Sequence, residues 1–293
     1  MQANIIEISS DNRELSIRRG FLVIAEHGGT VIAETPLDSI CAVMTTGRAV
    51  VYTQPLLSAL CENGIPLIVI GENYNPIGIL TPLIGNYKQM AVQSTQINAS
   101  KPLIKQLWQS LVRQKIKNQS RTLDLFGCNN RLHGIIGSVA SGDSGNAEAT
   151  AARLYFPALF GKDFRRWRMS GGANALMNYG YAVLRGAMAR QLAAAGLNLS
   201  LGIHHCNQLN PMCLCDDLIE LFRPAVDCEV YRIISENPNA EPNPETKRRL
   251  AAILEADSGG GPVIQIMQNL VWSLTRSFEQ KKNLLEFSNV LPN

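Results

Sequence analysis

The order of hydrophobic and polar residues divides the chain near residue 100. Before it, short apolar runs rich in Val and Ile alternate with turn-forming Gly, Asn, Asp and Ser, a pattern typical of strands joined by tight turns. The predicted strands cover residues 4–8, 14–17, 21–24, 30–33, 39–44 and 66–70. Residues 53–61 have helical spacing, with Pro55 suited to a first turn. We therefore expect a small sheet or sandwich of antiparallel strands that also carries one helix.

Beyond residue 100, apolar positions recur every three or four residues, as on one face of a helix. The first such stripe consists of Leu103, Ile104, Leu107, Leu111, Ile116 and Leu123. Basic residues are expected off this stripe, at Lys101, Lys105, Arg113, Lys115, Lys117 and Arg121. They form either a solvated helix surface or a contact with a phosphate backbone. Further helices are predicted over residues 147–160, 173–195, 245–254 and 262–282, and from residue 225 onward.

These patterns predict an α+β fold in which a small N-terminal β-rich domain precedes a larger all-helical domain that carries the chemistry. We place the β-rich domain at residues 1–85, a linker at residues 86–100 and the helical domain at residues 101–293. The length of 293 residues is enough for two modest domains.

Composition narrows the class of protein without identifying a function. Apolar residues make up 46% of the chain and charged residues 17%, as in an ordinary globular protein. No apolar run approaches the roughly 20 residues that a membrane helix needs, and no secretory leader precedes the first strand pattern. The seven cysteines are odd in number and irregularly spaced, so we expect reduced thiols in a soluble, cytoplasmic protein. A net charge of +3 permits nucleic acid as a partner but does not argue for it.

The strongest chemical signal lies in the stretch that runs from His204 and His205 to Asp216, Asp217 and Glu220. Asp217 and Glu220 are three residues apart, so on a helix they share one face. Acids gathered beside an imidazole are costly unless a cation or a reaction uses them. Hard cations such as Mg²⁺ and Mn²⁺ prefer oxygen ligands and tolerate one imidazole. The stretch therefore predicts part of a metal-dependent phosphoryl-transfer site, with loop histidines and a solvated acidic helix as the plain alternative.

Such a site needs another ligand from elsewhere, and Glu148 is the best candidate. It opens a predicted helix, whose N-terminal dipole favours an anion, although that position alone also explains a glutamate. A zinc site is disfavoured because Cys206, Cys213 and Cys215 lack the paired spacings of structural zinc ligands. Cys206 also lacks the flanking signature of a papain-like nucleophile. The glycines at 259–261 are not followed by Lys-Ser or Lys-Thr, which excludes a P-loop.

The run Gly202-Ile203-His204-His205, followed by Asp217-Leu218-Ile219-Glu220-Leu221-Phe222-Arg223-Pro224, resembles the signature of the CRISPR adaptation integrases, the Cas-one family. That signature is Gly-x-x-His and then an acidic helix ending in Phe-Arg-Pro. Further similarity is carried by Glu148 ahead of Ala152 and Tyr155-Phe156, and by Asn178, Tyr179-Gly180-Tyr181 and Leu184-Arg185. The resemblance spans nearly the whole chain. The short length and the loop after the histidines look like the type II branch.

The resemblance implies that Glu148, His205 and Glu220 are the catalytic residues and the ligands of Mg²⁺ or Mn²⁺, with Asp217 as a secondary acidic position. Glu220 stands where many members of the family have Asp. The resemblance also implies a homodimer, formed through the N-terminal domain, that joins a small ferredoxin-like Cas-two protein in the prokaryotic cytoplasm. The expected DNA contacts are Arg165, Arg166, Arg168, His204 and Tyr155.

The reaction that the resemblance implies is transesterification, in which the 3′-hydroxyl of a double-stranded prespacer attacks a phosphodiester at a CRISPR repeat. The same ligands would serve water as the nucleophile, so a standalone metal-dependent nuclease or junction resolvase is the first alternative. A non-catalytic DNA-binding scaffold with structural acids is an alternative from another class.

Overall fold

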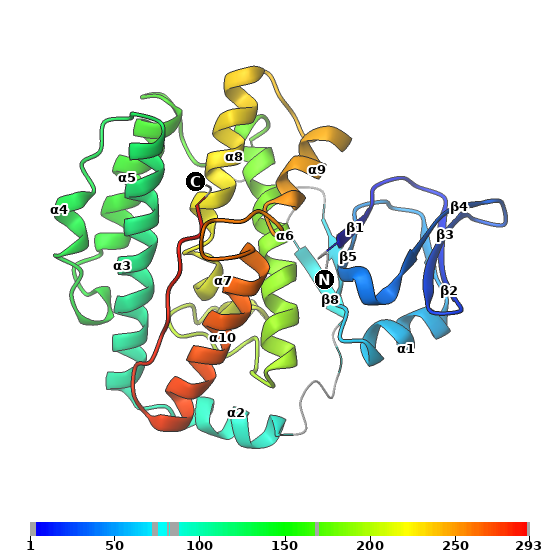
Figure 1. Cartoon of the computed structure of the whole chain (residues 1–293), viewed down its shortest axis with the longest axis horizontal. Coiled ribbons are helices and arrows are strands. Elements are labelled where there is room, and N and C mark those ends of the chain that lie inside the picture. The colour runs from blue at the N-terminus through cyan, green and yellow to red at the C-terminus, as the bar shows by residue number, and fades with distance from the viewer. Residues whose placement is uncertain (1–3, 72–75, 81, 83–87, 168–169, 292–293) are drawn as a thin grey trace.

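The N-terminal end of the chain folds into two four-stranded sheets (Figure 1). The computed structural model describes residues 4–71, 76–80, 82, 88–167 and 170–291. One sheet has the order β1-β5-β7-β8, and the other has the order β4-β3-β2-β6. In chain order the strands are β1 Asn4–Ile8, β2 Arg13–Arg18, β3 Phe21–Glu26, β4 Val31–Pro36, β5 Ile40–Thr45, β6 Val50–Tyr52, β7 Leu67–Ile70 and β8 Pro76–Leu80. Helix α1, Gln54–Glu62, connects β6 to β7.

The strands are not all antiparallel, which corrects the expectation from the turn pattern. Strands β2, β3 and β4 do form an antiparallel meander. However, β5 pairs in parallel with both β1 and β7, and β2 pairs in parallel with β6. Parallel neighbours cannot be joined by a tight turn. The chain therefore leaves the first sheet after β1, builds the meander of the second sheet, and returns to the first as β5.

A helical region follows, as the sequence predicts (Figure 1). Its helices are α2 Gln89–Ile97, α3 Lys101–Leu125, α4 His133–Ile136, α5 Ala147–Phe160, α6 Ala173–Ala194, α7 Cys213–Ile219, α8 Arg223–Glu236, α9 Pro244–Ala252 and α10 Val263–Gln280. Most of the segment expected to be a linker is thus helical. Helix α2 packs on α10 with Val92 and Gln96 buried, so tertiary contacts stabilise a helix whose own apolar stripe is short.

Helix α6 lies in the middle of the helical region and connects it to the first sheet (Figure 1). A Cβ atom at Gly186 of α6 would collide with Ile68 of β7, so glycine allows this helix to approach the sheet closely. Arg190 of the same helix donates a hydrogen bond of 2.7 Å to the carbonyl oxygen of Ile40. One hydrophobic core therefore runs from the first sheet through the helices, and a smaller core lies between the two sheets and α1.

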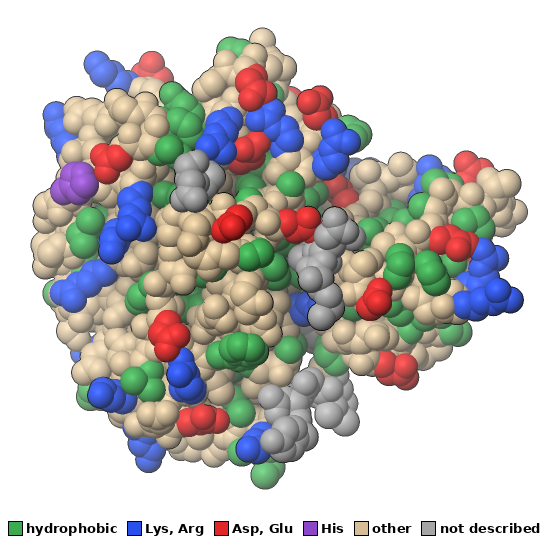
Figure 2. All heavy atoms as spheres, viewed as in Figure 1, with side chains coloured by type: hydrophobic (Ala, Val, Ile, Leu, Met, Phe, Trp, Pro, Cys, Tyr) green, Lys and Arg blue, Asp and Glu red, His purple; other side chains and the backbone are tan. Residues whose placement is uncertain are grey.

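The surface on one face of the molecule mixes charges of both signs (Figure 2). Acidic and basic side chains are scattered over both the helical region and the β-rich region on that face, with apolar side chains between them. Within the part of the chain that the structure describes, no helix is both long enough and apolar enough to cross a membrane.

Candidate active site

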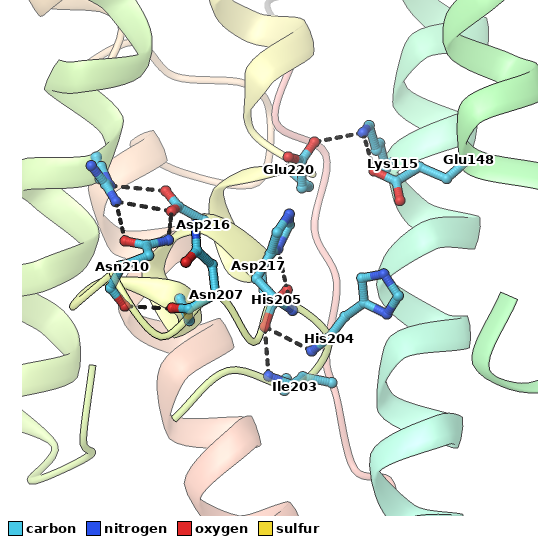
Figure 3. Close-up of polar contacts among 12 residues, drawn as sticks. Lys115, Glu148, Ile203, His204, His205, Asn207, Asn210, Asp216, Asp217 and Glu220 are labelled. Atoms are coloured by element: carbon cyan, nitrogen blue, oxygen red, sulfur yellow. Dashed lines mark hydrogen bonds and ion pairs between the residues drawn. The ribbon is translucent and has the colours of Figure 1, made fainter. Parts of the chain in front are cut away.

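The loop that carries His205 is organised by one buried carboxylate, that of Asp217 on α7. This side chain is fully buried, and it accepts hydrogen bonds from the backbone N–H groups of Ile203 at 2.5 Å, His204 at 3.0 Å and His205 at 3.1 Å (Figure 3). It also accepts a bond of 2.7 Å from Nδ1 of His205. A Cβ atom at Gly202 would collide with the carbonyl oxygen of His205 and with this carboxylate, which explains why the tight turn begins with glycine.

Asp217 fixes both the orientation and the protonation of the His205 ring. Because Nδ1–H donates to a carboxylate, Nε2 is the nitrogen left for a ligand when the ring is neutral. The hydrogen bond to Asp217 raises the pKa of His205, and partial burial of the ring opposes only part of that rise. Asp217 therefore acts through His205 and its loop. It was expected as a secondary metal ligand, but its oxygens are already engaged by four N–H donors.

Glu148 and Glu220 meet at the ammonium group of Lys115 (Figure 3). The Nζ atom of Lys115 on α3 lies 2.6 Å from Oε1 of Glu148 and 2.5 Å from Oε2 of Glu220. Glu148 comes from the first turn of α5, whose backbone N–H groups at residues 147 and 148 donate to the carboxylate of Asp143 at 2.8 and 3.1 Å. Glu220 follows α7 and is also paired with Arg223 at 3.0 Å. Three helices thus bring two acids to one cation.

For Lys115 and Glu220, the attraction between opposite charges changes the pKa more than burial does. Burial alone would lower the pKa of Lys115, but the charges of Glu220 and Glu148 hold it above its usual value. Burial alone would raise the pKa of Glu220, but Arg223 and Lys115 bring it down to about 2. The Glu220 carboxylate is therefore an anion at neutral pH, which is the state that binds a cation.

These residues lie along a cleft of about 590 Å³ between α3, α5, α6, α7 and α8. Its walls carry charges of both signs: the cations of Lys115, Arg166, Arg185 and Arg223, and the anions of Glu148, Asp216, Glu220 and Asp227. The guanidinium of Arg185 forms two contacts with Asp216, at 2.8 and 2.9 Å, and one with Asn210 at 2.8 Å. A cleft with several fixed cations can hold a polyanion such as a nucleic acid backbone.

The wall behind the cleft contains a second buried aspartate, Asp227 of α8. Its carboxylate accepts hydrogen bonds from the hydroxyl groups of Tyr181 at 2.5 Å and Tyr155 at 3.0 Å. Burial raises the pKa of Asp227 to about 6, and these two hydrogen bonds offset only part of the rise. Two guanidinium groups lie over the Tyr181 ring, those of Arg166 at 5.3 Å and Arg223 at 4.8 Å from its centroid.

The residues expected to contact DNA lie in different surroundings. Tyr155 is fully buried and bonded to Asp227, so a contact of this residue with DNA is wrong and its role is in the core. Arg166 lines the cleft, where Asn174 and Asn178 accept its hydrogen bonds at 3.0 and 2.7 Å.

Arg165 and His204 are exposed, and contacts of these residues with DNA stay predictions. His204 stacks on the buried ring of Trp108 with a centroid distance of 4.2 Å. Arg168 lies outside the described residues.

The sequence that forms this site matches a known protein family. The family model described as "CRISPR associated protein Cas1" matches residues 6–257. The chain belongs to the Cas1 family. A curated relative from Neisseria meningitidis serogroup C (strain 8013), the CRISPR-associated endonuclease Cas1, is 41% identical over 245 residues, which cover 82% of this chain and 80% of that protein. The similarity therefore extends over both the sheets and the helices that form the cleft.

Solved structures share the fold of this Cas1 family member. A casposase bound to its integration product superposes with a TM-score of 0.82 at 16% identity, covering 98% of this chain and 93% of the other. A chain of a Cas6-RT-Cas1–Cas2 complex superposes with a TM-score of 0.78 at 18% identity. That match covers 98% of this chain and 36% of the longer one. At these identities the structures establish the fold alone.

The donor set around Lys115 fits a divalent metal ion in its chemistry. Among the residues that the structure describes, no three His, Cys, Asp or Glu side chains converge closely enough to hold a metal. The carboxylates of Glu148 and Glu220 nevertheless approach one point, where the Lys115 ammonium supplies the positive charge. His205 presents Nε2 and donates Nδ1–H to a carboxylate, the arrangement usual for a metal-binding histidine. Two carboxylates and one imidazole are ligands that Mg²⁺ and Mn²⁺ accept.

Three residues of this region were missed from the sequence. Lys115 was expected off the apolar stripe, yet it follows Leu111 by four residues and is buried with it; that spacing was the available signal. Asp143 precedes α5 by four residues, as a capping side chain can. Asp227 follows Glu220 by seven residues, but no pattern in the sequence indicates that two tyrosines from other helices bond to it.

Proposed function

We propose that this chain is a divalent-metal-dependent DNA integrase and endonuclease of CRISPR adaptation. In this proposal it inserts DNA into a CRISPR array by transesterification with a 3′-hydroxyl group. The observation that carries the proposal is the meeting of Glu148 and Glu220 at one buried cation, beside a histidine whose free nitrogen is set by Asp217. Family membership supports it, and so does the relative from Neisseria meningitidis, which is named a CRISPR-associated endonuclease.

In the proposed reaction the 3′-oxygen of the incoming strand attacks phosphorus at the repeat border. A new phosphorus–oxygen bond forms as the bond to the 3′-oxygen of the repeat strand breaks, and the proton of the attacking hydroxyl ends on that leaving oxygen. Glu148, Glu220 and Nε2 of His205 would hold a divalent ion, which when bound lowers the pKa of the nucleophile and offsets phosphate charge. Arg166 and Arg223 line the same cleft, and their fixed charges would orient the phosphates on either side.

We also propose that the chain works as a homodimer together with a small Cas-two partner. The structural relative taken from a Cas1–Cas2 complex supports the partner. For the dimer, the supporting observation is the exposed edge strand β4, where Val31 and Ile32 are about half exposed; such edges commonly pair with another chain. Light scattering on an Ile32→Lys variant tests the contact, and an unchanged dimer mass would locate the interface elsewhere.

The function is tested with a prespacer duplex and a plasmid that contains repeat DNA, in the presence of Mg²⁺ or Mn²⁺. Glu148→Gln should reduce joined product to below about one hundredth of wild type, because a neutral amide is a poor ligand for a hard cation. Glu245→Gln is the matched control, since Glu245 also lies in the first turn of a helix but is exposed on α9.

Substrate chemistry separates the alternatives. A prespacer that ends in a 3′-deoxy sugar should give no joined product, and cutting of the repeat without joining would identify a nuclease or resolvase instead. Calorimetric titration with Mn²⁺ addresses the scaffold alternative: no binding by wild type, and joining that survives Glu148→Gln, would overturn the proposal.

A further inference from the structure

A second cavity, of about 580 Å³, lies against the loop that carries His205. Its walls come from the end of α2, the run from Ser200 to Gly202, and the segment from Cys206 to Asn210, with Ile104 and Phe278 behind them. His205, Asn207 and Asn210 line both this cavity and the catalytic cleft. We call it the α2 groove. A strand bound in the cleft can therefore continue past His205 into the groove.

The α2 groove differs from the cleft in its chemistry. None of the described residues that line it is Lys, Arg, Asp or Glu, whereas the cleft carries at least four of each sign. Apolar side chains of Ile97, Leu201 and Ile104 form part of its walls, and amide groups are supplied by Asn207 and Gln208. Phosphate groups need cations, so the groove does not suit a backbone. Flat apolar rings whose edges donate and accept hydrogen bonds suit it, and nucleobases are of this kind.

One wall of the α2 groove is held rigidly from within. The buried amide of Gln96 donates hydrogen bonds of 3.0 Å to the carbonyl oxygens of Asn198 and Leu201. The same amide accepts a bond of 2.9 Å from the backbone N–H of Asn198. These bonds tie α2 to the chain that leads directly into Gly202 and His205. The shape of the groove is thus coupled to the position of the His205 loop, and its volume falls within the roughly 300–1,000 Å³ of small-molecule sites.

Several apolar side chains at the rim of the α2 groove are exposed to solvent. Ile97 is 66% exposed, and Leu201 is 38% exposed. Leu209, in the loop between the two cavities, is 91% exposed. Neighbouring exposed apolar side chains beside a cavity mark a contact surface.

We propose that the α2 groove binds the nucleobase that flanks the reacting phosphate, and so gives the enzyme a preference for the sequence at the joining site. This inference rests on the proposed DNA-joining function. Its occupant follows from continuity with the cleft: a phosphate at His205 places the adjacent nucleotide beside the loop that separates the two cavities. Ile97 and Leu201 then cover the faces of the base, and Gln208 reads its edge.

The test measures joining rates on target duplexes in which the nucleotide on one side of the reacting phosphate is abasic. Wild type should lose about tenfold in rate when the base is removed on one side, and little on the other. The double variant Ile97→Ser/Leu201→Ser should be about tenfold slower on the intact target and no slower than wild type on that abasic target. Gln208→Ala should change the ratio of rates among the four bases at the same position. Met90→Ser is the control, because Met90 is exposed on α2 outside the groove.

Each other outcome counts against the α2 groove as a base site. Equal rates for wild type on intact and abasic targets on both sides would overturn it. A double variant that slows intact and abasic targets equally would show a structural role, since only a lost base contact depends on the base. Failure of wild type to join any of these targets would overturn the proposed function itself, and this inference with it.

Discussion

The two sides of the candidate active site are built differently. On the His205 side, one carboxylate from α7 is bonded to three successive backbone N–H groups and to the imidazole. On the Glu148 side, the acids of two helices are held by a single lysine ammonium from a third helix. The first side is a network of directed hydrogen bonds around a fully buried carboxylate. The second is an ion pair, in which Glu148 is still 23% exposed.

This difference indicates which side can change during the reaction. Backbone N–H groups cannot leave the Asp217 carboxylate without unfolding the loop, so the His205 side is preorganised. A lysine side chain has four rotatable bonds and a compact charge, so another cation can take its place between the carboxylates. We therefore regard the Asp217 network as fixed structure and the Lys115 bridge as exchangeable.

Breaking the fixed side should have the largest effect on stability. Asp217→Asn replaces a carboxylate oxygen with an NH₂ group that faces buried N–H donors, so we expect a loss of about 4 kcal/mol in the free energy of unfolding. Joining should fall roughly 10- to 100-fold at temperatures where the variant is folded, since His205 loses its orienting partner. Urea denaturation and the joining assay measure these effects.

Asp216→Asn is the matched control for Asp217→Asn, because it makes the same substitution at the neighbouring residue. Asp216 is partly exposed and paired with Arg185, so its loss should cost about 1 kcal/mol. Equal destabilisation by the two variants would mean that the four N–H donors do not depend on Asp217, and the contrast between the two sides would fail.

Asp227 is a third case, because its buried carboxylate is bonded to two tyrosine hydroxyl groups and not to backbone N–H groups or a bridging lysine. A pH titration tests whether this carboxylate, unlike that of Glu220, is protonated in the folded state. Burial raises the pKa of Asp227 from 3.8 to about 6, so the folded state retains a proton that the unfolded chain has released. The protonated group therefore contributes about 3 kcal/mol to the free energy of unfolding below about pH 4. This contribution is lost as the pH rises through about 6. Urea denaturation at pH 4, 5, 6 and 7 should show this loss in wild type.

Asp227→Asn removes the titrating group, so the stability difference between wild type and variant isolates its contribution. That difference should shift towards the variant as the pH rises from 4 to 6. A difference that stays constant over this range would show that Asp227 is ionised throughout, held by Arg166 and Arg223 in the way that Lys115 holds Glu220.

Features that depend on neighbours in the chain could be predicted from the sequence, whereas features that depend on packing between distant segments could not. His205, Asp217 and Glu220 lie within one local stretch, and the spacing of acids on a helix is readable because it depends on neighbours in the chain. The order of β-rich and helical regions is readable for the same reason. The roles of the residues depend on packing between distant segments. The sequence cannot show that Asp217 faces the N–H groups of its own loop, or that Tyr155 turns into the core towards Asp227.

The exchangeable side should show the smallest loss and the clearest response to metal. Lys115→Met removes the ammonium that bridges Glu148 and Glu220, and leaves Arg223 as the partner of Glu220 alone. Removing one partner of a fully buried pair costs roughly 3–5 kcal/mol; because Glu148 is partly exposed and screened, we expect about 2 kcal/mol. Mn²⁺ should then stabilise the variant more than it stabilises wild type, because in wild type the ion must first displace the ammonium. Thermal unfolding with and without Mn²⁺ measures both quantities.

Lys117→Met is the control for this comparison, since Lys117 is an exposed residue two positions further along α3. It should change neither the stability nor the response to Mn²⁺ measurably. If Mn²⁺ stabilises wild type and Lys115→Met equally, the ammonium and the metal do not compete for one place. The Lys115 bridge would then be as permanent as the Asp217 network, and the metal would have to bind by other donors of the cleft. A larger response in the variant would instead identify the lysine as the charge that keeps the two acids together until a metal ion binds.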